Sequence, residues 1–336
     1  MSEEQKPFHE KRRQLFLYEK YLDFMLSYTK ENTLPNLNKE IVEEKEDLQR
    51  KSHLSGGFAD EMYEILSLRY TAGAPLDPLR TDFTQVVEAY ERYAKYDREY
   101  RQEPRMPLFD FKHIDDYVRL IQLVSLAILL RREDLIPRIH DFVDGSAFDG
   151  QDALYEELTK AYVPNRLEID QWYHDQPYRH LLDVIDDDTP AERLSDLKRY
   201  LKAWYPNMKG CGWYNAHEHM SDEGGGYFGY WAFEAGAVAY LLDIDDSSID
   251  HMVYPKDLVA YARKLRDEGV KSPHPDHGRL RGLPNEIVPK TGWWWSPAFT
   301  GTDALRHFNQ GEHFPPIETT NYGGVFWYYD VDRQRG

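Results

Sequence analysis

The stretch GYWAFEAGAVAYLLDIDDSS, residues 229–248, joins an apolar segment to an acidic one. As far as Leu242 it is built from small, aromatic and aliphatic residues, a composition typical of a helix buried on several sides. Glu234 stands among them. Because burying an unpaired charge is unfavourable, Glu234 either has a partner such as a Tyr or an Arg or faces solvent, and we favour the first. At 243–248 carboxylates and serines replace the apolar residues, so the helix is predicted to end at an acidic corner.

Apolar residues at three- and four-residue spacings predict helices along most of the preceding chain. ENTLPN, with Pro35, and SGGF at 55–58 are expected to interrupt them. Thr189 is expected to cap a helix that begins at Pro190, since proline suits the first helical position. The predicted helices cover residues 8–30, 36–52, 59–70, 79–101, 114–130, 133–145, 151–162, 179–185, 190–205, 227–242 and 254–265.

The sequence therefore predicts an all-α fold of two helical bundles with a different C-terminal extension. We expect an N-terminal helical domain at 1–160, a C-terminal helical domain at 161–269 and an extension at 270–336. The extension is rich in Pro and Trp, and phrases such as PKTGWWWSPAF and YGGVFWYYD favour short strands within irregular chain. Its large rings, among them Trp293–Trp295, are expected to pack together, with an exposed binding surface as the alternative.

Net charge, cysteine count and the length of the apolar stretches exclude several classes of function. The formal net charge is −18, which disfavours direct binding to nucleic acid or to an anionic membrane and favours basic partners. The single cysteine, Cys211, excludes an intrachain disulfide. The first residues, MSEEQKPFHEKRRQLF, carry no apolar core of a signal peptide, and the longest apolar stretch, residues 117–130, is too short to span a bilayer. We therefore expect a cytoplasmic protein.

The sequence matches known catalytic motifs only weakly. The zinc pattern HExxH is absent, and His217 and His219 are only two residues apart. His274 and His277, with an Asp between them, form a second short cluster, so a metal-dependent hydrolase using either pair is the alternative function. The three glycines at 224–226 are not followed by the Lys and Ser or Thr of a phosphate-binding loop. We expect no catalytic residue, cofactor or metal.

A family resemblance is found between residues 229 and 265. The chain resembles the C-terminal signature of PoNi-type immunity proteins, which are cognate antidotes to polymorphic nuclease toxins delivered between bacteria. The segment RLSDLKRYLKAWYPNMKGCGWYNAH also fits the family. The positions that carry the resemblance are Gly229, Tyr230, Trp231, Glu234, Ala235, Ala237, the stretch LLDIDDS at 241–247, Tyr254, Pro255, Asp257 and Leu258.

The resemblance implies a non-enzymatic helical protein that binds the nuclease domain of its toxin and occludes the active site. Such toxins often travel by type VI secretion. Residues 185–260 hold fourteen acidic side chains and six basic ones. Carboxylates are complementary in charge to the basic surface with which a nuclease binds DNA phosphates. The sequence leaves open a homodimer, and an adaptor that binds through the aromatic extension. The predicted toxin contacts are Asp222, Glu223, Asp243, Asp245, Asp246 and Asp250.

Overall fold

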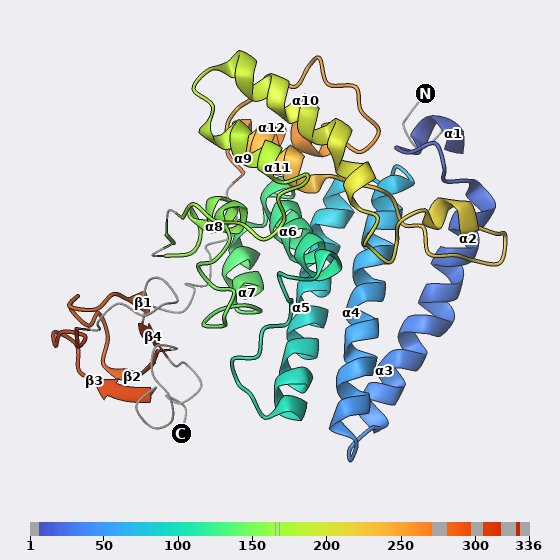
Figure 1. The fold of residues 1–336 in the computed structure, drawn as a ribbon. Helices are drawn as coiled ribbons and strands as arrows, with labels where there is room; N and C mark the ends of the chain where they lie inside the picture. Colours follow the sequence, from blue (N-terminus) through green and yellow to red (C-terminus); the bar gives the residue numbers. More distant parts are fainter. Residues whose placement is uncertain are drawn as a thin grey trace.

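The computed structural model describes residues 7–164, 166–167, 169–270, 281–296, 305–316 and 327–329. Within them helices dominate and the strands form one small sheet, which confirms the all-α class with a partly β extension (Figure 1). The α-helices are α1 (Phe8–Lys11), α2 (Glu19–Tyr28), α3 (Leu34–Glu43), α4 (Leu48–Thr71), α5 (Leu76–Arg101), α6 (Ile114–Leu129), α7 (Ile136–His140), α8 (Ala153–Thr159), α9 (Arg179–Asp186), α10 (Pro190–Asn207), α11 (Phe233–Leu241) and α12 (Lys256–Asp267). A π-helix, η2 (Thr29–Thr33), joins α2 to α3, and 3-10 turns are formed by η3 (Glu133–Leu135) and η4 (Ala216–His219).

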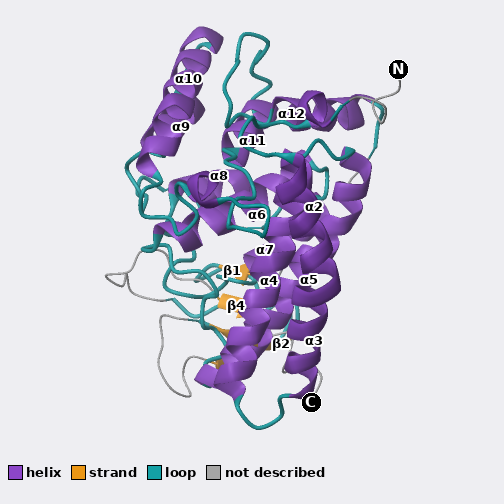
Figure 2. Ribbon diagram, turned by 90° about the vertical axis from the view of Figure 1, so that its right-hand side faces the viewer, coloured by secondary structure: helices purple, strands orange, loops and turns teal. Residues whose placement is uncertain are grey.

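The long helices α4 and α5 pack together, and α3 packs against α4 (Figure 2). The predicted break at 55–58 is wrong, because α4 runs through Gly56 and Gly57 without interruption. A Cβ at Gly56 would lie 3.1 Å from the ring of Tyr93 on α5. The glycine therefore permits a close helix contact, which offsets a helix-propensity cost of about 1 kcal/mol. Pro35 does not end a helix either, since it lies in the first turn of α3, where no N–H is needed.

The centre of the molecule is the contact between α6 and α11. From Tyr117 to Leu129 every residue of α6 except Arg119 is buried, and α11 is buried from Phe233 to Tyr240. A Cβ at Gly236 would lie 2.7 Å from Pro255 and 3.2 Å from Leu129, so the small residues of α11 allow neighbours on two sides. One continuous apolar cluster joins the helices on either side of residue 160. The domain bounds at 160 and 269 stay predictions.

The predicted helix over 227–242 begins only at Phe233. Residues 227–232, here called the central segment, run through the core outside any helix or strand. Gly229 has φ +114°, and a Cβ there would lie 2.1 Å from Oγ1 of Thr71. A positive φ is incompatible with a right-handed helix, so no helix passes through residue 229, and only glycine adopts this backbone at no cost and fits this contact.

Side chains satisfy the buried backbone of the central segment. The Tyr21 hydroxyl donates to the carbonyl of Tyr227 at 2.8 Å and accepts the Tyr227 N–H at 3.0 Å. The Thr71 hydroxyl donates to the carbonyl of Phe228 at 2.8 Å. Gln122 on α6 donates to the carbonyl of Trp231 at 2.8 Å. Buried backbone outside regular structure needs such partners, so these contacts fix α2, α4 and α6 around the central segment.

The predicted helix over 8–30 is wrong in its middle, where residues 12–18 form a non-helical strap between α1 and α2. Arg13 donates to Asp257 and to the carbonyls of Tyr70 and Ala74. Gln14, which is 1% exposed, accepts the N–H of Tyr230 and the hydroxyl of Tyr227, and donates to the carbonyls of Tyr230 and Met252. Packing and hydrogen bonds across distant segments therefore override the local helical pattern.

The predicted cap of α10 is confirmed. The Thr189 hydroxyl accepts the N–H of Glu192 at 3.2 Å and donates to the Glu192 carboxylate at 2.6 Å, and Pro190 is the first helical residue. This arrangement places a carboxylate in the first turn, where the helix dipole favours it.

The extension contains a four-stranded antiparallel sheet in the order β1-β4-β2-β3. Trp294 and Trp327 are fully buried in a small core separate from the helical one, so their predicted packing is confirmed, whereas Trp293 is 37% exposed. The predicted cluster at His274 and His277 lies outside the described residues. The strands are β1 (Arg281–Gly282), β2 (Gly292–Trp295), β3 (Leu305–Phe308) and β4 (Trp327–Tyr329).

None of the described helices combines the length and the apolar character needed to cross a lipid bilayer.

Replacing Gln14 with Leu tests the role of the strap. Gln14→Leu is expected to lower the free energy of unfolding by about 2–4 kcal/mol, because it leaves several buried polar groups of the central segment without partners. Urea denaturation measures this. Gln49→Leu, at an exposed position of α4, is the matched control and should change stability by less than about 0.5 kcal/mol. Equal stability of the two variants would contradict the assignment.

Candidate functional site

Glu234 is the buried carboxylate at the centre of the fold. It is 0% exposed, and its Oε1 accepts the Tyr200 hydroxyl at 2.7 Å and the Trp204 indole N–H at 2.6 Å. The expected tyrosine partner is thereby confirmed. Burial raises the pKa of Glu234 to about 7. Since both donors come from α10, Glu234 holds that helix against α11.

The acidic corner after α11 presents three exposed carboxylates. Asp243 accepts a hydrogen bond from Arg266 on α12 at 3.0 Å. The hydroxyl and N–H of Ser247 lower the pKa of Asp245, which faces solvent. Asp250 is exposed and borders a hollow that reaches Leu22 and Leu26 of α2. These three carboxylates are placed where a partner can reach them.

Asp246 departs from the prediction of a surface contact. It is 6% exposed, its Oδ2 accepts the Tyr254 hydroxyl at 2.7 Å and its Oδ1 accepts Arg263 at 2.6 Å. A buried carboxylate that is paired in this way holds the chain after α11 against α12, and it is not available to a partner.

The loop at 221–226 carries the other two predicted contacts and lies against α2. Asp222 is 3.4 Å from the amino group of Lys20, and Glu223 is exposed. A Cβ at Gly224 would lie 3.1 Å from the ring of Phe24, and one at Gly225 would lie 3.1 Å from the carbonyl of His219 and 3.3 Å from the ring of Tyr21 on α2. The consecutive glycines therefore let the loop pack closely on α2, which is a role that the sequence alone did not reveal.

His217 and His219 do not form a metal site within the described residues. The His217 ring packs on Phe16 with centroids 4.1 Å apart, and its Nδ1 lies 2.8 Å from the hydroxyl of Tyr230. His219 is exposed on η4. Neither joins a group of three ligand side chains in the part of the chain that the structure describes. The hydrolase alternative has no support at this pair.

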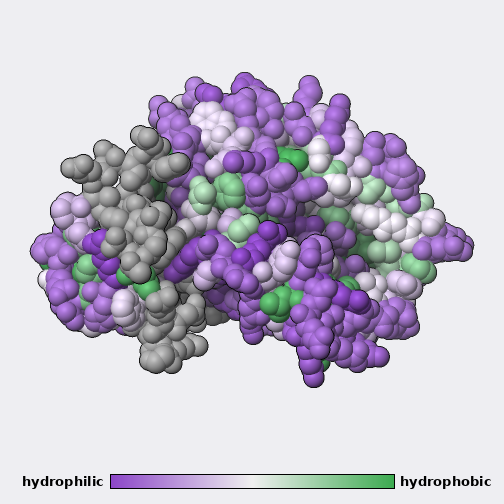
Figure 3. Space-filling model, turned by 60° about the horizontal axis from the view of Figure 1, so that its bottom comes forward, coloured by the Kyte–Doolittle hydropathy of each residue, from purple (hydrophilic) through white to green (hydrophobic). Residues whose placement is uncertain are grey.

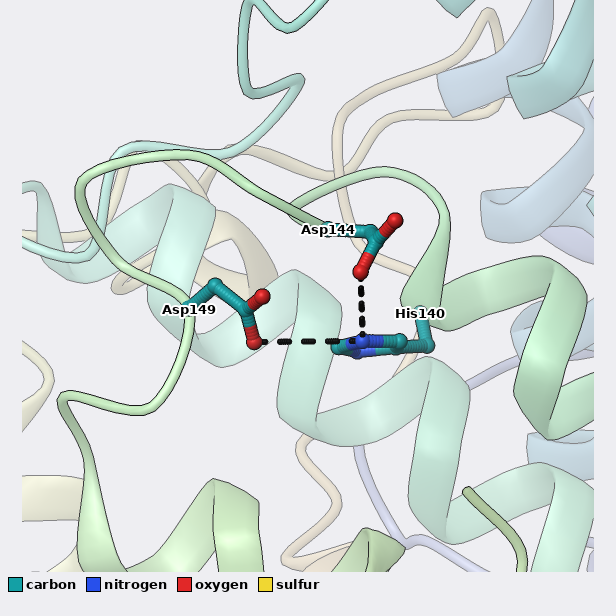
Figure 4. Close-up of side chains that lie close together, drawn as sticks. All are labelled: His140, Asp144 and Asp149. Atoms are coloured by element: carbon teal, nitrogen blue, oxygen red, sulfur yellow. Dashed lines mark ion pairs between the residues drawn. The ribbon is translucent and has the colours of Figure 1, made fainter. Parts of the chain in front are cut away.

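A different buried group, which the sequence did not suggest, has ligand geometry. His140, Asp144 and Asp149 offer atoms within 4.8 Å of one another, and their side chains point toward a common centre (Figure 4). His140 Nε2 lies 3.3 Å from Asp144 and 3.8 Å from Asp149. Such residue types bind divalent metals in other proteins.

A guanidinium already supplies the positive charge in this group. Arg166, whose side chain is 1% exposed, has Nη1 2.9 Å from Nε2 of His140 and 3.0 Å from Oδ1 of Asp149, and it also pairs with Glu156. Two of the three candidate ligand atoms, His140 Nε2 and Asp149 Oδ1, are thus engaged by Arg166, and Asp144 lies 3.7 Å from the guanidinium of Arg105. The network connects the end of α7 to α8 and the chain that follows it, which is a structural role.

Two stretches of the chain match one protein family. Residues 13–139 match the PoNe immunity protein (PoNi) N-terminal region, and residues 150–258 match the C-terminal region of PoNe immunity proteins (PoNi). Together they cover most of the helical part of the chain. This chain belongs to the PoNe immunity protein family. In this family member the C-terminal match includes the central segment and all six predicted contacts, and the N-terminal match includes α2.

The fold also has a counterpart of known structure. The crystal structure of protein PA2201 from Pseudomonas aeruginosa matches with a TM-score of 0.57 and 18% sequence identity, over 76% of this chain and 92% of that chain. At this identity the likeness shows the fold alone. Among curated proteins, none matches this PoNe immunity protein.

The raised pKa of Glu234 predicts a pH-dependent stability. A carboxyl whose pKa is about 7 when folded and near 4.5 otherwise contributes stability fully below pH 4.5, and that contribution is lost as the pH rises through 7. The loss is on the order of 3 kcal/mol at most. Glu234→Gln, which does not titrate, should remove this component from urea denaturation curves measured between pH 5 and pH 8.

The exposed Glu218 provides the matched control, because Glu218→Gln removes the same charge from the surface. That variant should keep the pH profile of the unsubstituted protein. A Glu234→Gln profile parallel to that of the unsubstituted protein would show that Glu234 is not the group responsible.

The Arg166 network predicts that divalent metals do not change the thermal stability of the protein. A ligand that binds only the folded protein raises its melting temperature. Because Arg166 engages His140 and Asp149, a millimolar excess of Zn²⁺ or Mn²⁺ should shift the melting temperature by less than about 1 °C relative to EDTA. A stoichiometric metal in elemental analysis, or a larger rise, would reinstate a metal site.

Proposed function

We propose that this chain binds the nuclease domain of a cognate PoNe toxin and neutralises it by covering its active site or its DNA-binding surface. The membership of both helical segments in the PoNe immunity family carries this proposal. The chain would act by stoichiometric binding rather than by catalysis. Its place of action would be the cytoplasm, where a DNase delivered by type VI secretion meets DNA.

Electrostatics supports this mode of inhibition. A nuclease holds the phosphate backbone with Lys and Arg side chains. A chain of net charge −18 is attracted to such a surface and can present carboxylates where phosphates would lie. Complementary charge mainly accelerates association and limits the choice of partners. An inhibitor that must capture a toxin before it cuts DNA benefits from fast association.

The exposed carboxylates are the proposed contacts. Asp222 and Glu223 lie on the loop beside α2, whereas Asp243, Asp245 and Asp250 lie on the chain between α11 and α12. Asp246 is omitted because Tyr254 and Arg263 hold it inside the fold. The proposal therefore concerns two surface segments that the sequence placed in a single acidic stretch.

Binding and protection test the proposal together. The purified chain, mixed with the catalytically inactivated nuclease domain encoded beside its gene, should elute as one complex in size-exclusion chromatography. Co-expression should protect bacteria from the active nuclease. The association rate should fall at least about tenfold as salt rises from roughly 50 to roughly 500 mM. Absence of a complex together with unchanged toxicity would refute the proposal.

A further inference from the structure

Helix α2 and the π-helix that follows it, residues 19–33, form a ridge that the rest of the fold covers only in part. Among these residues only Tyr21, Leu22 and Thr29 are buried. The ridge lies at the outer edge of the helices (Figure 1), and a space-filling view shows apolar and weakly polar groups on that right-hand side (Figure 3). Three separate surface hollows border it. Most of its exposed positions are polar, but Tyr28 is 51% exposed, and Phe24 and Met25 beside it are only partly covered.

One of the three hollows combines aromatic and acidic walls. It has a volume of about 680 Å³ and lies between the ridge, α4 and the loop at 221–226. We call it the acidic groove. Its lining residues are Phe24, Met25, Tyr28, Thr29, Thr33, Glu61, Glu223, Gly224 and Gly225.

The aromatic wall is rigid and accessible. Phe24 and Tyr28 stack with ring centroids 5.3 Å apart and planes 11° apart, and Tyr28 is 51% exposed. Close packing of Gly224 against Phe24 fixes the other side of the stack. Large exposed rings held in one position are the residues that most often dominate binding energy at interfaces.

The acidic wall faces the same space. Glu61 on α4 accepts the Thr29 hydroxyl at 2.7 Å, which orients its carboxylate, and Glu223 comes from the loop. In the described part of the chain no Lys, Arg or His forms an ion pair with either of them. The groove therefore has negative charge available for a cationic partner.

The backbone is irregular at the same place. Thr29 and Thr33, the first and last residues of η2, both line the groove. A π-helix is less stable than an α-helix and is found frequently at functional sites. This irregularity is independent of the charge and of the aromatic stack.

We propose that the acidic groove binds a basic segment of the toxin's nuclease domain, with a Lys or Arg between Glu61 and Glu223 and an apolar side chain against Tyr28. This inference rests on the proposed function and locates its binding surface. The carboxylates repel nucleic acid, and a second copy of this chain, with net charge −18, is a poor match for an acidic groove. A nuclease surface that binds phosphate has the complementary charge.

The other two hollows fit this partner less well. The hollow that includes Asp250 is lined by Arg13 and Lys256, which are already bonded to neighbouring groups of the fold. The hollow between α2 and α5 is mainly apolar, and its Asp82 is paired with Arg69 at 2.7 Å. Neither combines exposed carboxylates with an exposed Tyr, Phe or Trp ring.

Charge reversal and ring removal test the groove in the full chain. The probe is the catalytically inactivated nuclease domain encoded beside the gene, and calorimetry measures its Kd. The single variants Tyr28→Ala and Glu223→Lys should each weaken binding by about tenfold or more, and the double variant by about 100-fold. Both positions are exposed, and circular dichroism should show an unchanged fold.

Matched controls carry the same substitutions elsewhere. Tyr100→Ala changes a ring that is 37% exposed at the end of α5, and Asp188→Lys reverses an exposed charge between α9 and α10. Each should change Kd by less than about threefold.

The outcomes separate the two proposals. If the unsubstituted chain binds and the groove variants bind equally well, the groove is not the binding surface and the proposed function stands. If the unsubstituted chain fails to bind, the proposed function fails and the groove assignment fails with it. If the groove variants alter self-association in sedimentation and leave nuclease binding unchanged, the occupant is a second copy and the inference is overturned.

Discussion

The fold depends on the satisfaction of buried backbone in the central segment, residues 227–232. This segment lies in the core without the internal hydrogen bonds of a helix or a sheet. Its polar groups are paired with Gln14, Tyr21, Thr71 and Gln122, which come from four different parts of the chain. Since a buried unpaired peptide group is expensive, each of these parts is held in one position. The position of α2 beside the loop at 221–226 follows directly, because Tyr21 fixes it.

The cost of burying an unpaired polar group also divides the carboxylates into two populations. Glu234, Asp246 and Asp149 are inside the protein and are held by donors that come from other segments. None of these three side chains is exposed to a partner, because each is enclosed by the fold and bonded within it. Glu223 and Asp245 are exposed to solvent, where a partner can reach them. Net charge, counted along the chain, combines both populations, and only burial distinguishes them.

Local signals predicted much of the fold. The capping box at Thr189 and the apolar run of α6 depend on neighbours within one or two turns, and both were confirmed. The uninterrupted helix expected over 8–30 and the break expected at SGGF were wrong because distant contacts decide both places. Gln14 and Gly56 are determined by contacts more than 30 residues away, with Tyr230 and Tyr93 respectively. The acidic groove was not predicted either, because Tyr28, Glu61 and Glu223 come from separate segments that meet only in the folded protein.

The sequence by itself determined the helical class, the buried helix at its centre, the need of Glu234 for a partner, the acidic character and the family. These properties depend on composition, on periodicity and on motifs that are continuous in the chain. The tertiary structure decided which carboxylates are available, why Gly224 and Gly225 are glycines, and that a guanidinium engages His140 and Asp149. The physical reason is that burial and pairing are properties of atoms brought together from distant segments, and no local pattern specifies them.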